Sequence, residues 1–161
     1  MTIEVLFVCT ANICRSPMAE GAFRGIACDA GLEAAFHVDS AGTFGGHAGQ
    51  PPTWPAIRTA ASRGYDIARL RARQVREADI LHFDYVVAMD RGHLFELRAM
   101  APPKEFNRLR LLSEFCPPGS PVDVADPYGR SDRDYEEALD LIEAGCRGLL
   151  EALQRFVKKA I

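Results

Sequence analysis

One segment near the N-terminus restricts the folds open to this chain more than any other. Residues 5–8 are all apolar, as in a strand buried inside a sheet, and they end at Cys9. After five intervening residues, Arg15, Ser16 and Pro17 mark the beginning of a helix, because serine suits the N-cap and proline the first helical position. The sequence therefore predicts a strand, a short loop and a helix in direct succession.

The loop between this strand and this helix is suited to binding an anion. The first backbone N–H groups of a helix have no partner within it, and the helix dipole is positive at that end. The guanidinium of Arg15 can hold two phosphate oxygens at once, and a cysteine in such surroundings ionises readily to its nucleophilic thiolate. We therefore predict a phosphate-binding loop that follows a nucleophile, Cys9. The loop residues are Thr10, Ala11, Asn12, Ile13, Cys14, Arg15 and Ser16.

Strand-like and helix-like segments alternate along the rest of the chain. Strands are expected at residues 4–8, 36–40, 85–89 and 108–112, and helices at residues 16–30, 52–63, 76–81, 90–100 and 131–159. Strands that alternate with helices form parallel sheets with right-handed crossovers. We expect an α/β fold in which a single domain, residues 1–161, contains a doubly wound four-stranded parallel sheet with helices on both faces.

This fold predicts where the functional residues gather. Ligands of doubly wound sheets bind beyond the carboxyl ends of the strands. Cys9, Ser40 and Asp90 each lie at such an end. We therefore expect these three residues to converge on one edge of the sheet.

Composition and cysteine content describe an ordinary globular protein of a reducing compartment. Of the 161 residues, 48% are apolar and 25% charged, and the net charge of −3 gives no reason to expect nucleic acid or an anionic membrane as a partner. We find no secretory or membrane-spanning segment in the sequence. The five cysteines follow no disulfide or zinc-binding spacing, so we expect a cytoplasmic protein without a metal site.

The sequence C-T-A-N-I-C-R-S-P at residues 9–17 resembles the active-site loop of low-molecular-weight protein tyrosine phosphatases, in particular those of bacterial type. Further motifs of that family follow at the family's spacing: D-S-A-G-T at residues 39–43, A-R-Q at 72–74, F-D-Y-V-V-A-M-D at 83–90 and D-P-Y at 126–128. Several ordered motifs are far more specific than any one of them. The resemblance implies the flavodoxin-like fold of that family and the hydrolysis of phosphotyrosine and aryl phosphates with no metal and no other cofactor.

The resemblance assigns the chemistry to three residues. It makes Cys9 the nucleophile that forms a cysteinyl-phosphate, and Arg15 the side chain that binds the phosphate oxygens. Asp126 is then the general acid for the leaving group and afterwards the base that activates water. Pro127 supports this role, because a residue before proline is biased toward an extended conformation that can hold its carboxyl away from the backbone.

The same resemblance gives supporting roles to residues in and beside the loop. Asn12 and Ser40 brace the loop through side-chain hydrogen bonds, and Ser16 donates a hydrogen bond to the thiolate of Cys9. Cys14 is expected to form a disulfide with the oxidised nucleophile and so to protect it from irreversible oxidation.

Aromatic and apolar residues are expected to form the walls of the substrate cleft. The resemblance implies that Ile13 and Tyr128 pack against the ring of the substrate. Gly46 stands where many relatives have a tryptophan wall, so either Phe44 or Trp54 replaces it, or the cleft is more open.

Two other positions differ from the family pattern or stand out within it. Ala11 lies where the family usually has glycine, which costs about 1 kcal/mol if the backbone there needs a positive φ. His47 lies in a glycine-rich loop where bacterial relatives often carry histidine, and we interpret it as a surface residue rather than a catalytic one.

Other activities fit the sequence less well. Protein-arginine phosphatases share the fold but carry threonine in place of Ile13, whose bulk suits a phenyl ring better than a guanidinium. Arsenate reductases of this fold need a further cysteine pair near the third strand, and residues 82–89 contain none. A phosphopeptide-binding module or a sugar-transport phosphocarrier needs no catalytic set, so the presence of Arg15 and Asp126 opposes both.

The expected partners follow from the phosphatase interpretation. The substrate is a tyrosine-phosphorylated protein, and analogy with bacterial relatives makes a bacterial tyrosine kinase one candidate. Inorganic phosphate is expected as product and inhibitor, and the chain is expected to act as a monomer.

Overall fold

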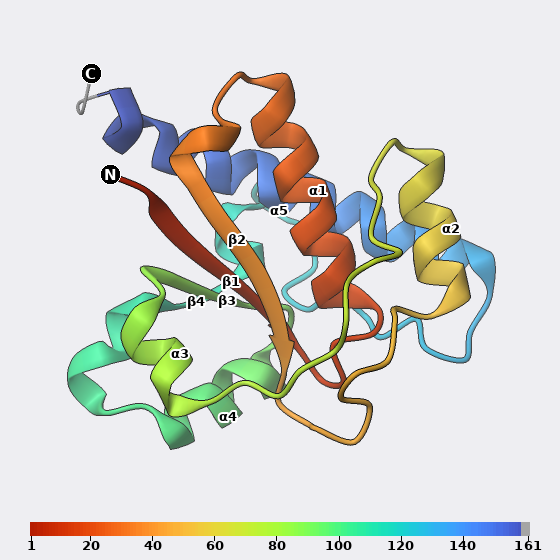
Figure 1. Cartoon of the computed structure of the whole chain (residues 1–161), viewed down its shortest axis with the longest axis horizontal. Helices are drawn as coiled ribbons and strands as arrows, with labels where there is room; N and C mark the ends of the chain where they lie inside the picture. Colours follow the sequence, from red (N-terminus) through yellow and green to blue (C-terminus); the bar gives the residue numbers. More distant parts are fainter. Residues whose placement is uncertain (159–161) are drawn as a thin grey trace.

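A computed structural model describes residues 1–158 and shows one parallel sheet at the centre of the molecule (Figure 1). Its strands are β1 (Ile3–Cys9), β2 (Phe36–Gly42), β3 (Tyr85–Ala88) and β4 (Leu109–Leu111). They lie in the order β2-β1-β3-β4, and every pair is parallel. The predicted doubly wound, four-stranded parallel sheet is therefore confirmed.

Helices cover both faces of the sheet, as predicted. The helices are α1 (Arg15–Asp29), α2 (Trp54–Ser62), α3 (Glu77–His82), α4 (Arg91–Met100) and α5 (Asp132–Lys158). Figure 1 shows α1, α2 and α5 on one side of the sheet and α3 and α4 on the other. The predicted end of the last helix, at Lys159, lies outside the described residues. Among residues 1–158, none of the helices is both long enough and apolar enough to cross a bilayer.

Strand β1 is apolar throughout because both of its faces are covered. Successive side chains of a strand point to opposite faces. Val5 and Phe7 accordingly pack into the core shared with α1, α2 and α5. Leu6 and Val8 pack into the core shared with α3 and α4. All four of these side chains are fully buried, which explains why the sequence shows a continuous apolar run instead of an alternating one.

Several element ends differ from the sequence prediction. Helix α1 begins at Arg15, and Cys14 takes the N-cap position without a side-chain cap, so Ser16 is not the N-cap. The Ser16 hydroxyl is directed instead toward Cys9, 2.9 Å away. Three short 3₁₀ helices, at Glu33–Ala35, Pro103–Arg108 and Leu112–Phe115, were not predicted. The last two flank β4 and shorten it to three residues.

The end of β1 lies at the switch point of the sheet, where the connection through α1 to β2 leads to one side of β1 and β3 lies on the other side. Such a switch point leaves a crevice beyond the carboxyl end of the central strand. The loop after β2 is attached to this crevice, because the backbone N–H groups of Thr43 and Phe44 donate to the carbonyls of Cys9 and Thr10 at 3.0 and 2.8 Å. The fold thus places Cys9 at the base of the crevice.

Candidate active site

The loop from Cys9 to α1 turns tightly at Asn12. Among residues 1–158, Asn12 is the one non-glycine residue with a positive φ, 59°. Asparagine tolerates this left-handed conformation better than most residues. Ala11 does not adopt it, so the backbone cost considered for alanine at that position does not arise.

The side chain of Asn12 holds the loop to three neighbouring segments. Its Nδ2 donates to Ser16 Oγ at 2.8 Å and to Ser40 Oγ at 2.9 Å, and its Oδ1 accepts from the backbone N–H of Arg73 at 3.0 Å. Ser40 in turn donates to the buried carboxyl of Glu20 at 2.8 Å. Asn12, Ser16 and Ser40, which the sequence analysis grouped as loop supports, therefore form one buried network.

Glu20 was missed by the sequence analysis, because the SPMAE sequence places it within an ordinary helix. Its carboxyl is almost wholly buried in α1 and pairs with Arg24 at 2.8 Å. Burial raises the pKa of Glu20, and the Arg24 guanidinium opposes that rise. Ser40 and Arg24 together provide the partners that a buried carboxyl needs.

We expect Asn12→Ala to lower the free energy of unfolding by about 4 kcal/mol, because three hydrogen bonds of about 1 kcal/mol each are lost and alanine adds about 1 kcal/mol of strain at the positive φ. Asn12→Gly is the matched control, since it loses the same bonds but accepts the positive φ. Glycine should therefore be less destabilising than alanine by about 1 kcal/mol. Urea unfolding measures both variants. Equal stability of the two would show that the positive φ at this position carries no strain.

Cys9 lies at the base of the loop, with its sulfur beside a hydroxyl. The residue is only 3% exposed, and Sγ is 2.9 Å from Ser16 Oγ. Because Ser16 Oγ already accepts a hydrogen from Asn12, its own hydrogen is available to the sulfur. The alternative acceptor, the carbonyl of Ala41, is farther away at 3.4 Å. The arrangement is suited to stabilising a thiolate.

The guanidinium of Arg15 is fixed along one edge and open along the other. Nη1 donates to Asp90 Oδ2 and to the carbonyl of Val124, both at 2.8 Å, which uses both of its hydrogens. Nη2 donates to Thr10 Oγ1 at 3.3 Å. Within residues 1–158, Nε has no hydrogen-bond partner, so Nε and the second hydrogen of Nη2 form the edge available to an oxyanion. Asp90, Cys9 and Ser40 therefore lie together at the carboxyl ends of the strands, as predicted for the sheet.

Asp126 and Tyr128 lie at the mouth of the crevice. Asp126 Oδ2 is 3.7 Å from Arg15 Nη2, and its side chain is 52% exposed. Its other oxygen, Oδ1, accepts from the backbone N–H of Tyr128 at 3.1 Å. This bond closes a local turn that orients the carboxylate while leaving Oδ2 accessible to a ligand.

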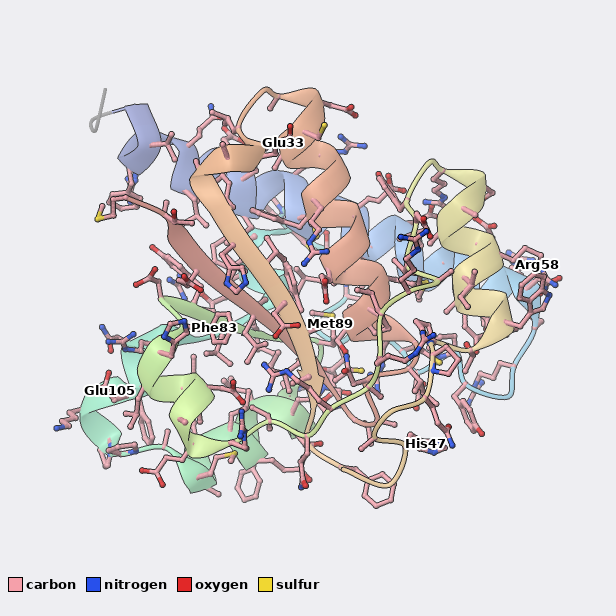
Figure 2. All side chains as sticks on the ribbon, viewed as in Figure 1. Glu33, His47, Arg58, Phe83, Met89 and Glu105 are labelled. Carbon is pink, nitrogen blue, oxygen red and sulfur yellow. The ribbon has the colours of Figure 1, made fainter. Side chains whose placement is uncertain are left out.

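The loop after Cys9, the loop after β2 and the Asp126 loop line a cavity of about 180 Å³. Its lining residues are Cys9, Thr10, Ala11, Ile13, Cys14, Arg15, Phe44, His47, Asp126 and Tyr128. The predicted catalytic and wall residues therefore share one pocket. Figure 2 shows His47 in the loop beyond the end of β2, on the same edge of the sheet. His47 is half-buried at the pocket rather than fully on the surface, and its Nδ1 is 2.9 Å from Gln50 Oε1.

One of the two aromatic residues considered in place of the missing tryptophan lines the cavity. Phe44 lines the cavity, whereas Trp54 is 67% exposed and does not. The ring of Phe44 lies directly over Gly46, where an added Cβ would come closer to the ring atoms than real contacts allow and would force the ring to move. Glycine at this position therefore leaves room for the Phe44 ring at the cavity.

Cys14 lies on the side of the loop that faces α5. Its Sγ is 3.4 Å from the hydroxyl of Tyr135 and 3.5 Å from Thr53 Oγ1. Burial raises the pKa of the Cys14 thiol, so this group is protonated near neutral pH. Its predicted disulfide with Cys9 stays a prediction.

His93 in α4 also reaches the site, although no sequence motif points to it. The residue is buried, and Nε2 lies 2.8 Å from Thr10 Oγ1. Burial lowers the pKa of His93, although the nearby carboxylate of Asp90 opposes this. Nothing in its sequence context separates His93 from the other three histidines, because its contact with Thr10 depends on how α4 packs against β3 and β4.

A cysteine held beside a hydroxyl donor, facing an open guanidinium edge and a carboxylate, defines an enzyme that transfers phosphate through a cysteine. Comparison with known proteins agrees with this class. The family model "Low molecular weight phosphotyrosine protein phosphatase" matches residues 4–159. The chain belongs to this family and uses its general cysteine-based mechanism for hydrolysing phosphate esters of tyrosine.

Two curated relatives and one solved structure illustrate the match. The low molecular weight protein-tyrosine-phosphatase YfkJ of Bacillus subtilis is 41% identical over 153 residues, covering 95% of this chain and 97% of the relative. A low molecular weight protein-tyrosine-phosphatase of Streptomyces coelicolor is 42% identical over 161 residues, covering 98% of each. The crystal structure of a protein tyrosine phosphatase from Entamoeba histolytica, with Hepes in its active site, superposes with a TM-score of 0.92 at 31% identity, covering 96% of this chain and 98% of that one. The sequence-based identification is confirmed.

Proposed function

We propose that this chain dephosphorylates phosphotyrosine in proteins, with Cys9 as nucleophile, Arg15 as phosphate-binding residue and Asp126 as general acid and base. The observation that carries the proposal is that these three side chains line one cavity, where the Cys9 sulfur lies at hydrogen-bond distance, 2.9 Å, from the Ser16 hydroxyl. A thiolate at the base of the cavity faces the phosphorus, while Asp126 at the mouth faces the leaving group.

The reaction proceeds in two steps, of which the first consumes the thiolate and the second regenerates it. First, the Cys9 sulfur forms a bond to phosphorus as the bond to the phenolic oxygen breaks, and Asp126 gives its proton to that oxygen. Water then attacks the phosphorus and passes a proton to Asp126. The S–P bond breaks, which releases inorganic phosphate and restores the Cys9 thiolate and the protonated carboxyl.

Arg15 and the loop amides stabilise the negative charge on the transferring phosphoryl group. The free edge of the guanidinium, Nε and Nη2, can bond two equatorial oxygens, while Asp90 and Val124 keep it from rotating. The backbone N–H groups at the beginning of α1 add donors that are already oriented. Such preorganised donors stabilise the transition state without reorganisation during the reaction.

The cavity favours an aromatic phosphate ester over a guanidinium phosphate. Ile13 is buried in the cavity wall, and Phe44 and Tyr128 provide two ring faces at its rim. A phenyl ring gains apolar contacts with these side chains. A phosphoarginine side chain gains little from Ile13, and we therefore expect it to be the poorer substrate.

Rapid-quench labelling tests the mechanism. Enzyme mixed with a phosphotyrosine peptide labelled on phosphorus should carry up to one phosphate per chain, and peptide mapping should locate it on Cys9. Label on any other residue would overturn the assignment. A parallel assay compares kcat/KM for phosphotyrosine and phosphoarginine, and a preference for phosphoarginine would overturn the substrate class while leaving the nucleophile intact.

We expect Phe44→Ala to raise KM for a phosphotyrosine peptide about five- to ten-fold, because the ring contact is worth about 1 kcal/mol or somewhat more. The effect on kcat should be small, since the ring touches the leaving group and not the phosphorus. Trp54→Ala is the matched control, because Trp54 is exposed and lies outside the cavity. Steady-state kinetics measures both. A larger change in Trp54→Ala than in Phe44→Ala would contradict this assignment of the wall.

The physiological substrate follows from analogy. We propose a bacterial tyrosine kinase as one candidate, acting in the cytoplasm, and all five cysteines are unpaired, which is consistent with a reducing compartment. Pull-down with Asp126→Ala, which should hold a phosphoprotein without turning it over, identifies the partner. Elution of the captured protein by inorganic phosphate is the control for binding through the site.

A further inference from the structure

Four side chains around the phosphate pocket form a closed ring of polar contacts. Arg15 Nη1 donates to Asp90 Oδ2 at 2.8 Å, and Arg15 Nη2 donates to Thr10 Oγ1 at 3.3 Å. His93 completes the ring, because its Nε2 is 2.8 Å from Thr10 Oγ1 and its Nδ1 is 3.1 Å from Asp90 Oδ1. Thr10 and Arg15 line the cavity, whereas His93 lies behind them.

The Asp90 carboxylate is shared between the helix and the arginine. Its Oδ1 caps α4 by accepting the backbone N–H of His93 at 2.9 Å, while Oδ2 pairs with Arg15. Asp90 and the main chain of His93 are therefore fixed relative to one another by the first turn of α4. The imidazole is 5% exposed and lies between Asp90 and Thr10.

The position of the imidazole hydrogen can be deduced from these contacts. Burial lowers the pKa of His93, so the ring is neutral at pH 7 and carries one hydrogen. Nδ1 lies beside the negative oxygen of Asp90, although not in hydrogen-bond alignment with it. A hydrogen on Nδ1 is attracted to that oxygen, whereas a lone pair there is repelled. Nε2 is therefore the acceptor, and the Thr10 hydroxyl donates its hydrogen to it.

This direction of hydrogen bonding determines what Thr10 offers to the arginine. Once the hydroxyl hydrogen points to His93, the lone pairs of Oγ1 are free to accept from Arg15 Nη2. That bond fixes one hydrogen of Nη2 and leaves the other, with Nε, on the edge that faces the cavity. Without His93, the hydroxyl could rotate and present its hydrogen to the guanidinium, which would repel it.

We propose that His93 is a positioning residue, which acts through Thr10 to hold the phosphate-binding edge of Arg15 in place. The inference rests on the proposed role of Arg15 as the phosphate-binding residue. His93 touches neither the phosphate nor the leaving group, so its effect on turnover is indirect.

The first test reads the hydrogen directly in the ligand-free protein, so it does not depend on the catalytic scheme. Nitrogen-15 NMR of the imidazoles at pH 7 should show the His93 hydrogen on Nδ1, with Nε2 unprotonated and acting as an acceptor. In Thr10→Val the hydroxyl that donates to Nε2 is gone, so the Nε2 resonance should shift toward that of an unprotonated nitrogen that accepts no hydrogen bond. A hydrogen on Nε2 in the unmodified protein would overturn the proposal.

The second test is a double-mutant cycle. His93→Phe removes both nitrogens at similar volume, and Thr10→Val removes the hydroxyl at similar shape. Each should lower kcat/KM for p-nitrophenyl phosphate about ten-fold and weaken inhibition by phosphate, as expected when one hydrogen bond to a charged group is lost. The double variant should lose about ten-fold as well, because both changes break one chain of contacts. An additive loss of about a hundred-fold would overturn the proposal.

Two further variants separate positioning from a general packing effect. His93→Gln places an amide oxygen near the position of Nε2, and Thr10→Ser keeps the hydroxyl, so each should retain activity within about three-fold of the unmodified enzyme. Leu97→Ala removes a fully buried side chain of the same helix, and its effect should simply add to that of Thr10→Val. Equal losses in His93→Gln and His93→Phe would show that the acceptor is irrelevant, which contradicts the proposal. Circular dichroism confirms folding, and if His93→Phe does not fold, the His93→Gln comparison and the NMR test decide.

Discussion

Replacing Cys9 with serine is expected to lower kcat for p-nitrophenyl phosphate by about 10⁴-fold or more, while the protein still folds and binds inorganic phosphate. A serine hydroxyl attacks well only when a base removes its proton. The side-chain partner of the Cys9 sulfur, in the part of the chain that the structure describes, is the hydroxyl of Ser16, which is not a base. Nitrophenol release measures turnover, and phosphorus NMR or calorimetry measures phosphate binding.

Phosphate binding should survive this change because the cysteine sulfur is not a phosphate-binding group. Arg15 and the amides at the beginning of α1 remain in place, and an uncharged hydroxyl repels the phosphate less than a thiolate does. Cys28→Ser is the matched control, since Cys28 is an exposed cysteine of α1 that does not line the cavity. Comparable losses in Cys28→Ser and Cys9→Ser, or persistent turnover in Cys9→Ser, would contradict the assignment of the nucleophile.

The fold could be predicted from the sequence because its strongest signals are local. The apolar run of β1 has no alternation, which is the pattern of a strand covered on both faces, and the structure buries it on both. Helix ends differ from the prediction, because they depend on where a side chain finds a partner. Ser16 illustrates this: its local sequence favours an N-cap, but its hydroxyl is directed to Cys9 instead.

The site was predicted to the extent that its residues occur in ordered motifs. The loop after Cys9 and the Asp126 motif were both recognisable from the sequence, and both line the cavity. Contacts that cross between elements carried no such signal. His93 contacts Thr10 across 83 positions of sequence, and the ring of Phe44 reaches the cavity over Gly46, where the missing side chain leaves space for it. These features depend on packing, which a single sequence does not display.

The position of Asp126 at the cavity mouth leads to an expectation about the leaving group. Asp126→Asn should lower kcat/KM for phosphotyrosine by about 10²- to 10⁴-fold, the usual contribution of a general acid. The phenol of tyrosine has a pKa of about 10, so its oxygen is a poor leaving group unless it is protonated as the bond breaks. The asparagine oxygen can still accept from the backbone N–H of Tyr128, which preserves the local turn.

Leaving groups with different basicity separate this role from a role in binding. Nitrophenolate disperses its own negative charge and needs less protonation, so Asp126→Asn should lose much less activity on its ester than on phosphotyrosine. Asp123→Asn is the matched control, because Asp123 belongs to the same loop but pairs with Arg91. An equal loss on both substrates would mean that Asp126 does not protonate the leaving group, since only proton transfer makes the loss grow with the basicity of the departing oxygen.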